Sequence, residues 1–463
     1  MNVRWIIAAV LGVCVLAALV LVFNRDARRA AELRAVEAIG EAAVARMGAM
    51  DGGDRAASFI EIPVEVRKLA DNVYQARGVA NTHLIATSEG NVLYDTGLAL
   101  QVPKQKRLLE EAAPEAPLTH IIVSHSHADH SGGVKFWIEE GSEVIAHEEF
   151  SEEQRYLKEL EPYFYFRNRT LFPFMPEERP EIGLISYGGV EPTRTVRNGE
   201  PYAFELGGTR FVVLATPGAE GADNVVLWLP DQKILFSGDF FGPLYPQFPN
   251  IFTMRGEKIR KPIEYIRSLN EIIALEPEMI VPSHKDPIVG KDVIMDGLVR
   301  MRDAVQYVHD QTVAGMNAGK TIYELMEEIQ LPPHLELNQA HGRVSWGVKS
   351  IWEYYATWFH FDRTTELYPV SPFDVYPEVV ELAGIDGLVE RANAHIAAGR
   401  PVHALHLLEI ALGPDGTNRA ALEARRAALA ILLEEAETGL QNSYEIDWLE
   451  FRLRDTDERL GAG

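Results

Sequence analysis

The chain has 463 residues, enough for roughly two or three domains with a large buried core. Apolar residues make up 47% of the chain and charged residues 24%, which excludes a wholly disordered protein. The formal net charge is −24 at pH 7, without a long run of Lys or Arg. We therefore expect no nucleic-acid-binding surface, because such a surface needs clustered positive charge.

Residues 1–26 are predicted to form a transmembrane anchor. An apolar run from Trp5 to Phe23 carries no charge, and its length is close to the roughly 20 residues that cross a bilayer. The alternative is a cleaved signal peptide, whose apolar region spans about 7–15 residues and ends in a small-x-small site that this run lacks. Cys14, the only cysteine, lies in this run, so the remaining chain has no disulfide and no thiolate ligand.

Residues 27–60 are predicted to be a solvated stalk helix and a linker, because an Ala/Arg/Glu-rich stretch ends at Asp-Gly-Gly-Asp. Residues 61–290 alternate between short β-like runs and helical runs, which is typical of an α/β sandwich with sheets faced by helices. The predicted strands are 73–77, 83–86, 91–94, 120–123, 143–146, 210–215, 224–229 and 233–236. The predicted helices are 101–113, 131–140, 147–161 and 262–275.

Residues 291–463 are predicted to form a separate all-α region, because apolar residues recur there at spacings of three and four. The predicted helices are 293–315, 322–329, 347–359, 403–412 and 420–436. The last two are separated by Gly-Pro-Asp-Gly and resemble one hairpin of a helical array.

A histidine-rich turn between a predicted strand and a predicted helix carries the strongest chemical signal. It contains His125, His127, Asp129 and His130, and such imidazole and carboxylate groups are the ligands that zinc prefers in catalytic sites. Side chains two apart on an extended segment point the same way, so His125 and His127 can bind one metal. Asp129 and His130 lie past the bend and can reach a second metal about 3.5–4 Å away. We therefore predict two divalent metal ions, assigned as Zn²⁺.

This H-x-H-x-D-H pattern resembles the signature of the metallo-β-lactamase superfamily, and the resemblance covers most of residues 65–290. It implies an αββα sandwich with further ligands at the ends of later strands. These are Asp239, in Ser-Gly-Asp, as a bridging aspartate and His284, in Pro-Ser-His, as the last histidine. Asp95 matches the early aspartate of the family, and we expect it to orient a ligand histidine.

Glu220 lies where most of the superfamily has a histidine, and this feature resembles the alkyl sulfatases. In those enzymes a glutamate fills this ligand position and a second carboxylate bridges the metals nineteen residues later, which is the spacing of Glu220 and Asp239. The bridging residue of the family is a glutamate, so Asp239 departs from it by one methylene. The resemblance implies that one metal is held by His125, His127 and Glu220, the other by Asp129, His130 and His284, with Asp239 bridging.

The stretch from Pro249 to Arg260 resembles the sulfate-binding segment of the alkyl sulfatases, although it lies three residues further from Asp239 than in the family. The resemblance implies that Asn250 and Arg255 hold the sulfate group, and a planar guanidinium suits a tetrahedral oxyanion. The alternative is a surface loop with structural Arg and Asn side chains.

The helical region resembles the alkyl sulfatase dimerisation domain in segments 301–312, 331–335, 349–359 and 376–393, which implies a homodimer. We expect no counterpart of the sterol-carrier-like C-terminal domain of that family, so long-chain detergent substrates are less well supported. The arginines that follow the predicted anchor favour a cytoplasmic body by the charge rule. The family resemblance instead implies a periplasmic or otherwise extracytoplasmic body.

Together these features predict a binuclear metallo-hydrolase that cleaves alkyl sulfate esters with a metal-activated water. Asp129 and Asp239 are its predicted catalytic carboxylates, and Arg255 and Asn250 are expected to stabilise the growing charge on the sulfate. A hydrolase of the same fold acting on a lactone, thioester or phosphoester would keep the metal ligands without needing Arg255. A di-iron redox enzyme would need a flavin domain or partner, and a non-catalytic scaffold would not need a full ligand set.

Overall fold

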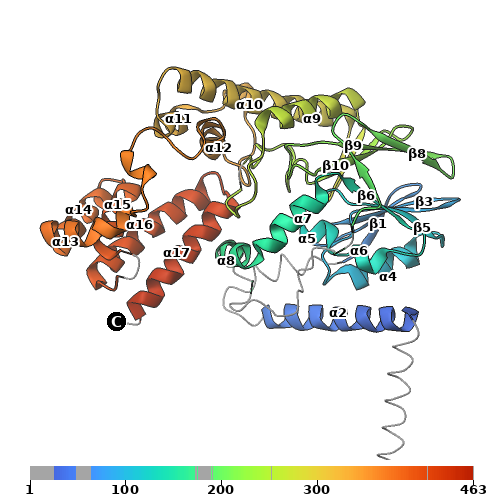
Figure 1. Ribbon diagram of the computed structural model, residues 1–463, viewed down its shortest axis with the longest axis horizontal. Helices are drawn as coiled ribbons and strands as arrows, with labels where there is room; N and C mark the ends of the chain where they lie inside the picture. The colour runs from blue at the N-terminus through green and yellow to red at the C-terminus, as the bar shows by residue number, and fades with distance from the viewer. Residues whose placement is uncertain are drawn as a thin grey trace, which may run out of the picture. The chain divides into compact units, whose positions relative to one another are not determined.

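The computed structural model describes residues 25–47, 64–172, 175, 189, 191–251, 253–413 and 416–461. These residues belong to two compact units, which we call the sandwich unit and the helical unit (Figure 1). The sandwich unit comprises residues up to 161, 178–243 and 270–296; the helical unit comprises 162–177, 244–269 and 297–463. The predicted membrane span, Trp5 to Phe23, lies outside the described residues, and within them no helix combines the length and apolarity needed to cross a bilayer.

The sandwich unit contains two β-sheets. The first has the strand order β1-β2-β3-β4-β5-β6-β7; its pairs are antiparallel up to β4 and parallel from β4 to β7. Its strands are β1 (Val66–Ala70), β2 (Val73–Ala76), β3 (Thr82–Thr87), β4 (Gly90–Tyr94), β5 (Leu118–Ile122), β6 (Glu143–His147) and β7 (Arg194–Val196).

The second sheet has the order β13-β12-β11-β10-β9-β8, and only β11 and β12 pair in parallel. Its strands are β8 (Tyr202–Leu206), β9 (Thr209–Ala215), β10 (Val225–Leu229), β11 (Ile234–Gly238), β12 (Met279–Pro282) and β13 (Ile288–Val289). All eight predicted strands are therefore present within one or two residues of their expected bounds, and short strands such as β1, β7 and β8 are additions.

The core of the sandwich unit follows from the alternation of side chains along the strands. Ile85 and Val92 belong to a buried cluster that also contains Phe211 and Leu227 of the second sheet. Their neighbours Leu84 and Leu93 belong to a different cluster, which includes residues of the helices on the outer face of the first sheet. Because successive side chains of a strand point to opposite faces of the sheet, one apolar strand contributes residues to both core clusters. The predicted α/β sandwich is thus confirmed.

Several helices of the sandwich unit depart from their predicted bounds. Helices α4 (Val102–Ala112) and α9 (Pro262–Leu275) agree with prediction. The single helix predicted over 131–140 is instead two short helices, α5 (Ala128–Ser131) and α6 (Val134–Trp137), separated by Gly132 and Gly133. The helix predicted over 147–161 begins later, as α7 (Phe150–Glu159), and α8 (Glu161–Leu171) follows it directly.

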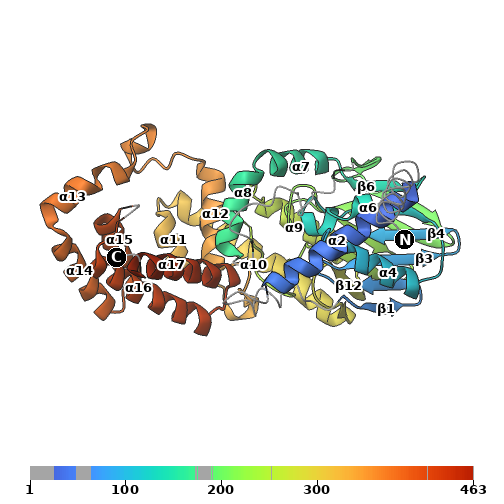
Figure 2. The same cartoon turned by 90° about the horizontal axis from the view of Figure 1, so that it is seen from below.

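Helix α2 (Arg25–Met47) is present where a stalk helix was predicted, but it is not wholly solvated. Leu33 and Val36 pack against the outer core cluster, and Arg29 donates from Nη2 to the carbonyl of Phe136 at 2.6 Å. Figures 1 and 2 show α2 beside α4. One side of α2 therefore packs against this unit through Leu33 and Val36.

The helical unit agrees with the predicted all-α region. Helices α14, α15 and α16 enclose a core of Leu and Ala side chains, and α16 packs along α17 (Figure 2). The helices are α10 (Lys291–Asn317), which begins in the sandwich unit, α11 (Ile322–Glu328), α12 (Val344–Ala356), α13 (Tyr376–Ala383), α14 (Ile385–Ala397), α15 (Pro401–Leu412), α16 (Arg419–Thr438) and α17 (Ser443–Gly461).

The division into units differs from the predicted boundary between residues 290 and 291. Residues 244–269 belong to the helical unit, although the sequence pattern places them in the catalytic domain. The reason is the packing of Phe248, which is fully buried and whose backbone N–H donates to the carbonyl of Asn338 at 2.9 Å. A Cβ atom on Gly347 of α12 would lie 2.7 Å from the Phe248 ring, so this helix position requires glycine.

Candidate metal centre

The predicted ligands lie at the carboxyl ends of strands in the sandwich unit. The His-rich turn follows β5, whose last residues Ile121 and Ile122 are fully buried. Asp239 follows β11 and His284 follows β12, two neighbouring parallel strands. The carboxyl ends of parallel strands meet at one edge of a sheet, so residues 45 positions apart in sequence come together there.

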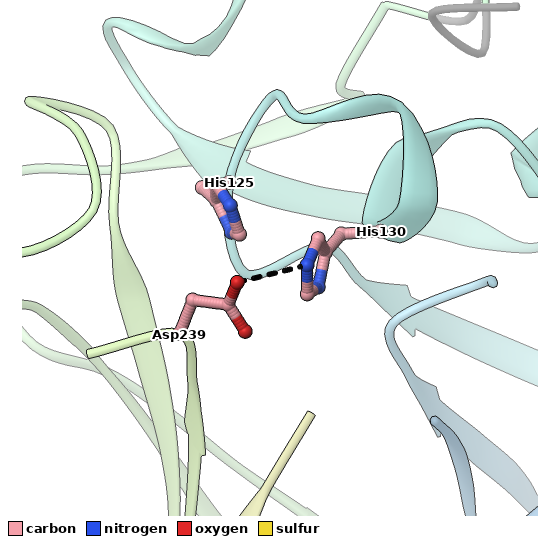
Figure 3. Close-up of side chains that lie close together, drawn as sticks. All are labelled: His125, His130 and Asp239. Atoms are coloured by element: carbon pink, nitrogen blue, oxygen red, sulfur yellow. Dashed lines mark ion pairs between the residues drawn. The ribbon is translucent and has the colours of Figure 1, made fainter. Parts of the chain in front are cut away.

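Asp129, His130, His284 and Asp239 form one compact group. His284 Nε2 lies 3.5 Å from Asp129 Oδ2 and 3.1 Å from Asp239 Oδ2. His130 Nε2 lies 3.5 Å from Asp129 Oδ2 and 3.3 Å from Asp239 Oδ2, and Figure 3 shows His130 and Asp239 pointing toward each other. The three atoms offered by Asp129, His130 and His284 lie within 4.8 Å of one another, which matches the set predicted for one metal.

The set predicted for the other metal is also brought together. His125 Nε2 lies 2.9 Å from His127 Nδ1, and His127 Nδ1 lies 3.8 Å from Glu220 Oε1. Atoms of His125, His130 and Asp239 lie within 4.8 Å of one another, so Asp239 faces both sets, as a bridging ligand must (Figure 3). The glutamate that replaces the usual histidine is buried within this set and not on a solvated loop.

Two buried atoms show that these residues fit a cation. Among the described residues, His130 Nε2 and Asp239 Oδ1 have no hydrogen-bond partner. A buried polar atom without a partner costs free energy, unless a ligand satisfies it. The donor set consists of imidazole nitrogens and carboxylate oxygens, which is the set that zinc accepts in catalytic sites.

The electrostatics of the group keep its carboxylates ionised. Burial alone would raise the pKa of Asp129 and of Asp239, but the imidazoles of His130 and His284 hold both values well below the ordinary range. Burial alone would lower the pKa of His130 and His284, and the same carboxylates raise both. Without a metal, the carboxylates and the imidazoles therefore stabilise each other as opposite charges. A bound cation would supply the positive charge in place of the imidazoles, because a histidine binds metal only when it has lost its added proton.

The buried carboxylate of Asp95 holds the residues around the candidate metal site in place through hydrogen bonds. Asp95 follows β4 with a positive φ of 57°. Its carboxylate accepts hydrogen bonds from the Ser124 N–H at 2.8 Å, from the Ser124 hydroxyl at 2.9 Å and from the Ser283 hydroxyl at 2.5 Å. It also lies 2.9 Å from His130 Nδ1, so that Nδ1–H donates to Asp95 and Nε2 is directed to the metal group. This agrees with the expected orienting role.

Asp223 is a buried carboxylate beside the candidate site that its sequence context did not predict. It lies three positions after Glu220, is almost fully buried, and accepts the N–H of Ser126 at 2.8 Å. It therefore ties the Glu220 loop to the backbone between His125 and His127. Burial raises its pKa to about 7, and the nearby Glu153 carboxylate adds to this shift. The only signal in the sequence was an acidic residue in a Gly-rich loop, which is indistinguishable from a solvated one.

Asn250 and Arg255, the two predicted sulfate-binding residues, belong to the helical unit, whereas all seven predicted metal ligands belong to the sandwich unit. Both lie in the segment 249–260. Asn250 is only 7% exposed. This part of the segment is therefore not an open surface loop, which was the alternative to a sulfate-binding segment.

The fold and the ligand set define the class of protein. Residues 76–284 match the family model of the metallo-β-lactamase superfamily. Residues 321–452 match the family model of alkyl sulfatase dimerisation. The chain therefore joins a metallo-β-lactamase domain to an alkyl sulfatase dimerisation domain, which confirms the resemblance seen in its sequence.

Several relatives with curated functions are named as sulfatases. The chain is 29% identical over 325 residues to a linear primary-alkylsulfatase of Pseudomonas sp., covering 65% of this chain and 60% of the relative. It is 25% identical over 416 residues to an alkyl/aryl-sulfatase of Saccharomyces cerevisiae, covering 83% and 63%. The chain thus spans about 60% of the length of these relatives.

Solved structures show the same fold. The stereoselective inverting sec-alkylsulfatase Pisa1 from Pseudomonas sp. superimposes with a TM-score of 0.70 at 22% identity, covering 85% of this chain and 66% of that one. The similarity therefore extends over both units and not only over the metallo-β-lactamase domain.

Proposed function

We propose that this chain is a binuclear metal-dependent hydrolase that cleaves alkyl sulfate esters to an alcohol and sulfate. The observation that carries the proposal is that Glu220 Oε1 lies 3.8 Å from His127 Nδ1, in the same His-rich turn whose Asp129 and His130 group with His284 and Asp239. That glutamate distinguishes the site from the histidine type common in the superfamily. The dimerisation domain and the sulfatase relatives support the same assignment.

The proposed roles follow from the positions of the side chains. His125, His127 and Glu220, which lie pairwise at 2.9 and 3.8 Å, would hold one ion. Asp129, His130 and His284 would hold the other, with Asp239 shared. When bound, two such ions, assigned as Zn²⁺, supply Lewis-acid activation of water and of the ester. Asp95 keeps the Nδ1 proton on His130 and so fixes its tautomer.

Asn250 and Arg255 are proposed to bind the sulfate group in this reaction. A guanidinium donates two hydrogen bonds in a fixed fork to a tetrahedral oxyanion, and the Asn250 amide can donate a third. Because negative charge grows on the sulfate and on the leaving oxygen, donors placed beforehand stabilise the transition state more than the ground state.

An Arg255→Ala variant tests this assignment directly. We expect kcat/KM for decyl sulfate to fall roughly 100- to 1000-fold, the order found for loss of one preorganised charge-stabilising donor. The bound metal measured by elemental analysis should stay unchanged. Arg155→Gln is a matched control, because this arginine forms exposed ion pairs with Glu152 and Glu159 on α7.

An unchanged kcat/KM in Arg255→Ala would remove the sulfate-binding assignment. The alternative, a hydrolase of a lactone, thioester or phosphoester, would then be favoured, since it uses the same metal ligands without Arg255. Turnover of these ester classes by the wild-type protein, compared with decyl sulfate, separates the two functions.

The proposed enzyme is a homodimer, and an exposed apolar segment supports this. Large apolar side chains are exposed from residue 355 to 382, and Phe361 and Leu382 are each 88% exposed. A stretch of chain with so many exposed large apolar side chains is typical of an interaction site. The members of this segment are Tyr355, Trp358, Phe361, Leu367, Tyr368, Val370, Phe373, Val375, Val379 and Leu382.

We expect the double variant Phe361→Asp/Leu382→Asp to be monomeric, because two buried charges would oppose association of the apolar segments. Size-exclusion chromatography with light scattering measures the mass. Val289→Asp on β13, where the valine is 64% exposed, should leave a dimer. A dimer that survives the double substitution would show that the contact lies elsewhere.

We further propose that the run Trp5–Phe23 anchors the protein in a membrane with the body on the extracytoplasmic side. Membrane fractionation of the full chain, followed by protease accessibility in intact spheroplasts, tests both statements. Recovery in the soluble fraction would contradict the first, and protection from protease the second.

A further inference from the structure

A single carboxylate joins the two proposed sulfate-binding residues within the helical unit. Glu257 Oε1 lies 3.1 Å from Arg255 Nη2, and Glu257 Oε2 accepts a hydrogen bond from Arg260 Nη2 at 3.0 Å. Arg260 in turn donates from Nη1 to the Asn250 carbonyl at 2.7 Å. Glu257 therefore orients the guanidinium that is proposed to bind the substrate, and through Arg260 it reaches the second binding residue.

The backbone beneath Arg255 is fixed independently by Arg167 of α8. Arg167 donates from Nε to the Arg255 carbonyl at 3.1 Å and from Nη2 to the Met254 carbonyl at 2.9 Å. Gly256 has a φ of +83°, and a Cβ atom there would lie 2.9 Å from Arg167 Nε. Arg167 already holds the backbone at Arg255. Glu257 therefore acts on the Arg255 side chain: it fixes the direction of the guanidinium and places a negative charge beside it.

The cluster is buried enough for each charge to matter. The Glu257 side chain is 14% exposed and that of Arg260 is 5% exposed. Among the described residues, the Asn250 Nδ2 donor has no hydrogen-bond partner, which leaves it available to an anion. With water largely excluded, the interaction of an incoming anion with both Arg255 and Glu257 is weakly screened.

We propose that Glu257 is a specificity-determining residue that makes this site favour a singly charged tetrahedral ester over a doubly charged one. The inference rests on the proposed function, in which Asn250 and Arg255 hold the anionic group of the substrate. A sulfate monoester carries one negative charge, whereas a phosphate monoester, with a second pKa of about 6, carries nearly two at pH 8. Both groups are tetrahedral, so charge and not shape must separate them, and the fixed carboxylate repels the second charge.

Three probes with the same alkyl chain separate charge from shape at pH 8. They are decyl sulfate and decyl methyl phosphate, each with one negative charge, and decyl phosphate, with nearly two. Calorimetry on the full-length, metal-loaded protein measures the binding of both phosphates, and competition against decyl sulfate turnover provides a second measure. The decisive quantity is the ratio of the Kd of decyl phosphate to that of decyl methyl phosphate.

Glu257→Gln should lower this ratio roughly tenfold, the order expected for removing one charge pair from a partly buried site. Arg260→Gln removes a positive charge from the same cluster and should raise the ratio. Glu264→Gln is the matched control, because that carboxylate pairs with Lys261 at 2.9 Å at the start of α9, in the same unit, and is more exposed. Its ratio should equal that of the wild type.

An unchanged ratio in Glu257→Gln would overturn the proposal. Equal weakening of both phosphates would do so too, because a purely structural role affects all anions alike. If the wild type does not turn over decyl sulfate, the proposed function fails, and the calorimetric ratio still decides whether Glu257 discriminates by charge.

Discussion

Asp239→Ala is expected to lower kcat/KM for decyl sulfate by at least roughly 1000-fold and to reduce the bound metal from two ions per chain to one or fewer. Asp239 faces both ligand sets: its Oδ2 lies 3.1 Å from His284 Nε2 and 3.3 Å from His130 Nε2, and its Oδ1 has no hydrogen-bond partner among the described residues. Loss of this carboxylate leaves imidazoles of both sets facing each other without the anion between them. Elemental analysis of the purified protein measures the metal, and a sulfate-release assay measures the rate.

Asp231→Ala is the matched control for this experiment. Asp231 lies in the turn before β11, is exposed, and forms only a surface ion pair with Arg210 among the described residues, at 3.1 Å. Such pairs contribute little to stability, so activity and metal content should remain those of the wild type. Two ions retained in Asp239→Ala, or activity within threefold of the wild type, would contradict the shared-ligand assignment.

Asp239→Glu gives a further measure, because the bridging residue of the alkyl sulfatases is a glutamate. Its added methylene should preserve both ions while changing the rate, since the carboxylate is kept and only its reach increases. A variant that loses its metal would show that the surrounding turn is shaped for the shorter side chain.

The His-rich turn could be predicted as a candidate metal site from local rules, whereas Asp239 and His284 were implied by the resemblance to the metallo-β-lactamase superfamily. His125 to His130 lie within a few residues, and the turn after β5 determines how they face each other. Asp239 and His284 are distant in sequence, but each follows an apolar strand, and parallel strands bring their ends together. Glu220 required the spacing typical of a family, because a lone glutamate in a loop carries no signal by itself.

The contributions that escaped prediction depend on tertiary packing. Asp223 reaches the N–H of Ser126 only because β9 and β10 bring its loop beside the His-rich turn. Leu33 and Val36 of helix α2 pack against the core of the sandwich unit. The pattern of apolar residues in α2 is too weakly periodic to have predicted that one of its faces is buried. The segment around Phe248 joins the helical unit through contacts with residues about ninety positions later. None of these partners can be inferred from local spacing.

Asp95→Ala should destabilise the metal-free protein by about 3–5 kcal/mol, the cost of breaking a buried charged network by removing one partner. The Asp95 carboxylate is fully buried and is the common partner of Ser124, His130 and Ser283, which come from two separate strand ends. Removing it leaves these donors without an acceptor and frees His130 to change its tautomer. Urea unfolding with a chelator present measures the loss of free energy.

The same substitution should weaken metal binding more than the unfolding result alone explains, because the orientation of His130 depends on Asp95. Asp95→Asn is the informative companion: the amide oxygen can still accept one hydrogen bond, so stability should recover in part, whereas the charge that fixes His130 Nδ1–H is gone. Asp71→Ala, in the exposed turn between β1 and β2, serves as the control. If Asp95→Asn binds both ions as tightly as the wild type, a hydrogen-bond acceptor is sufficient at this position and the negative charge is not what holds the histidine.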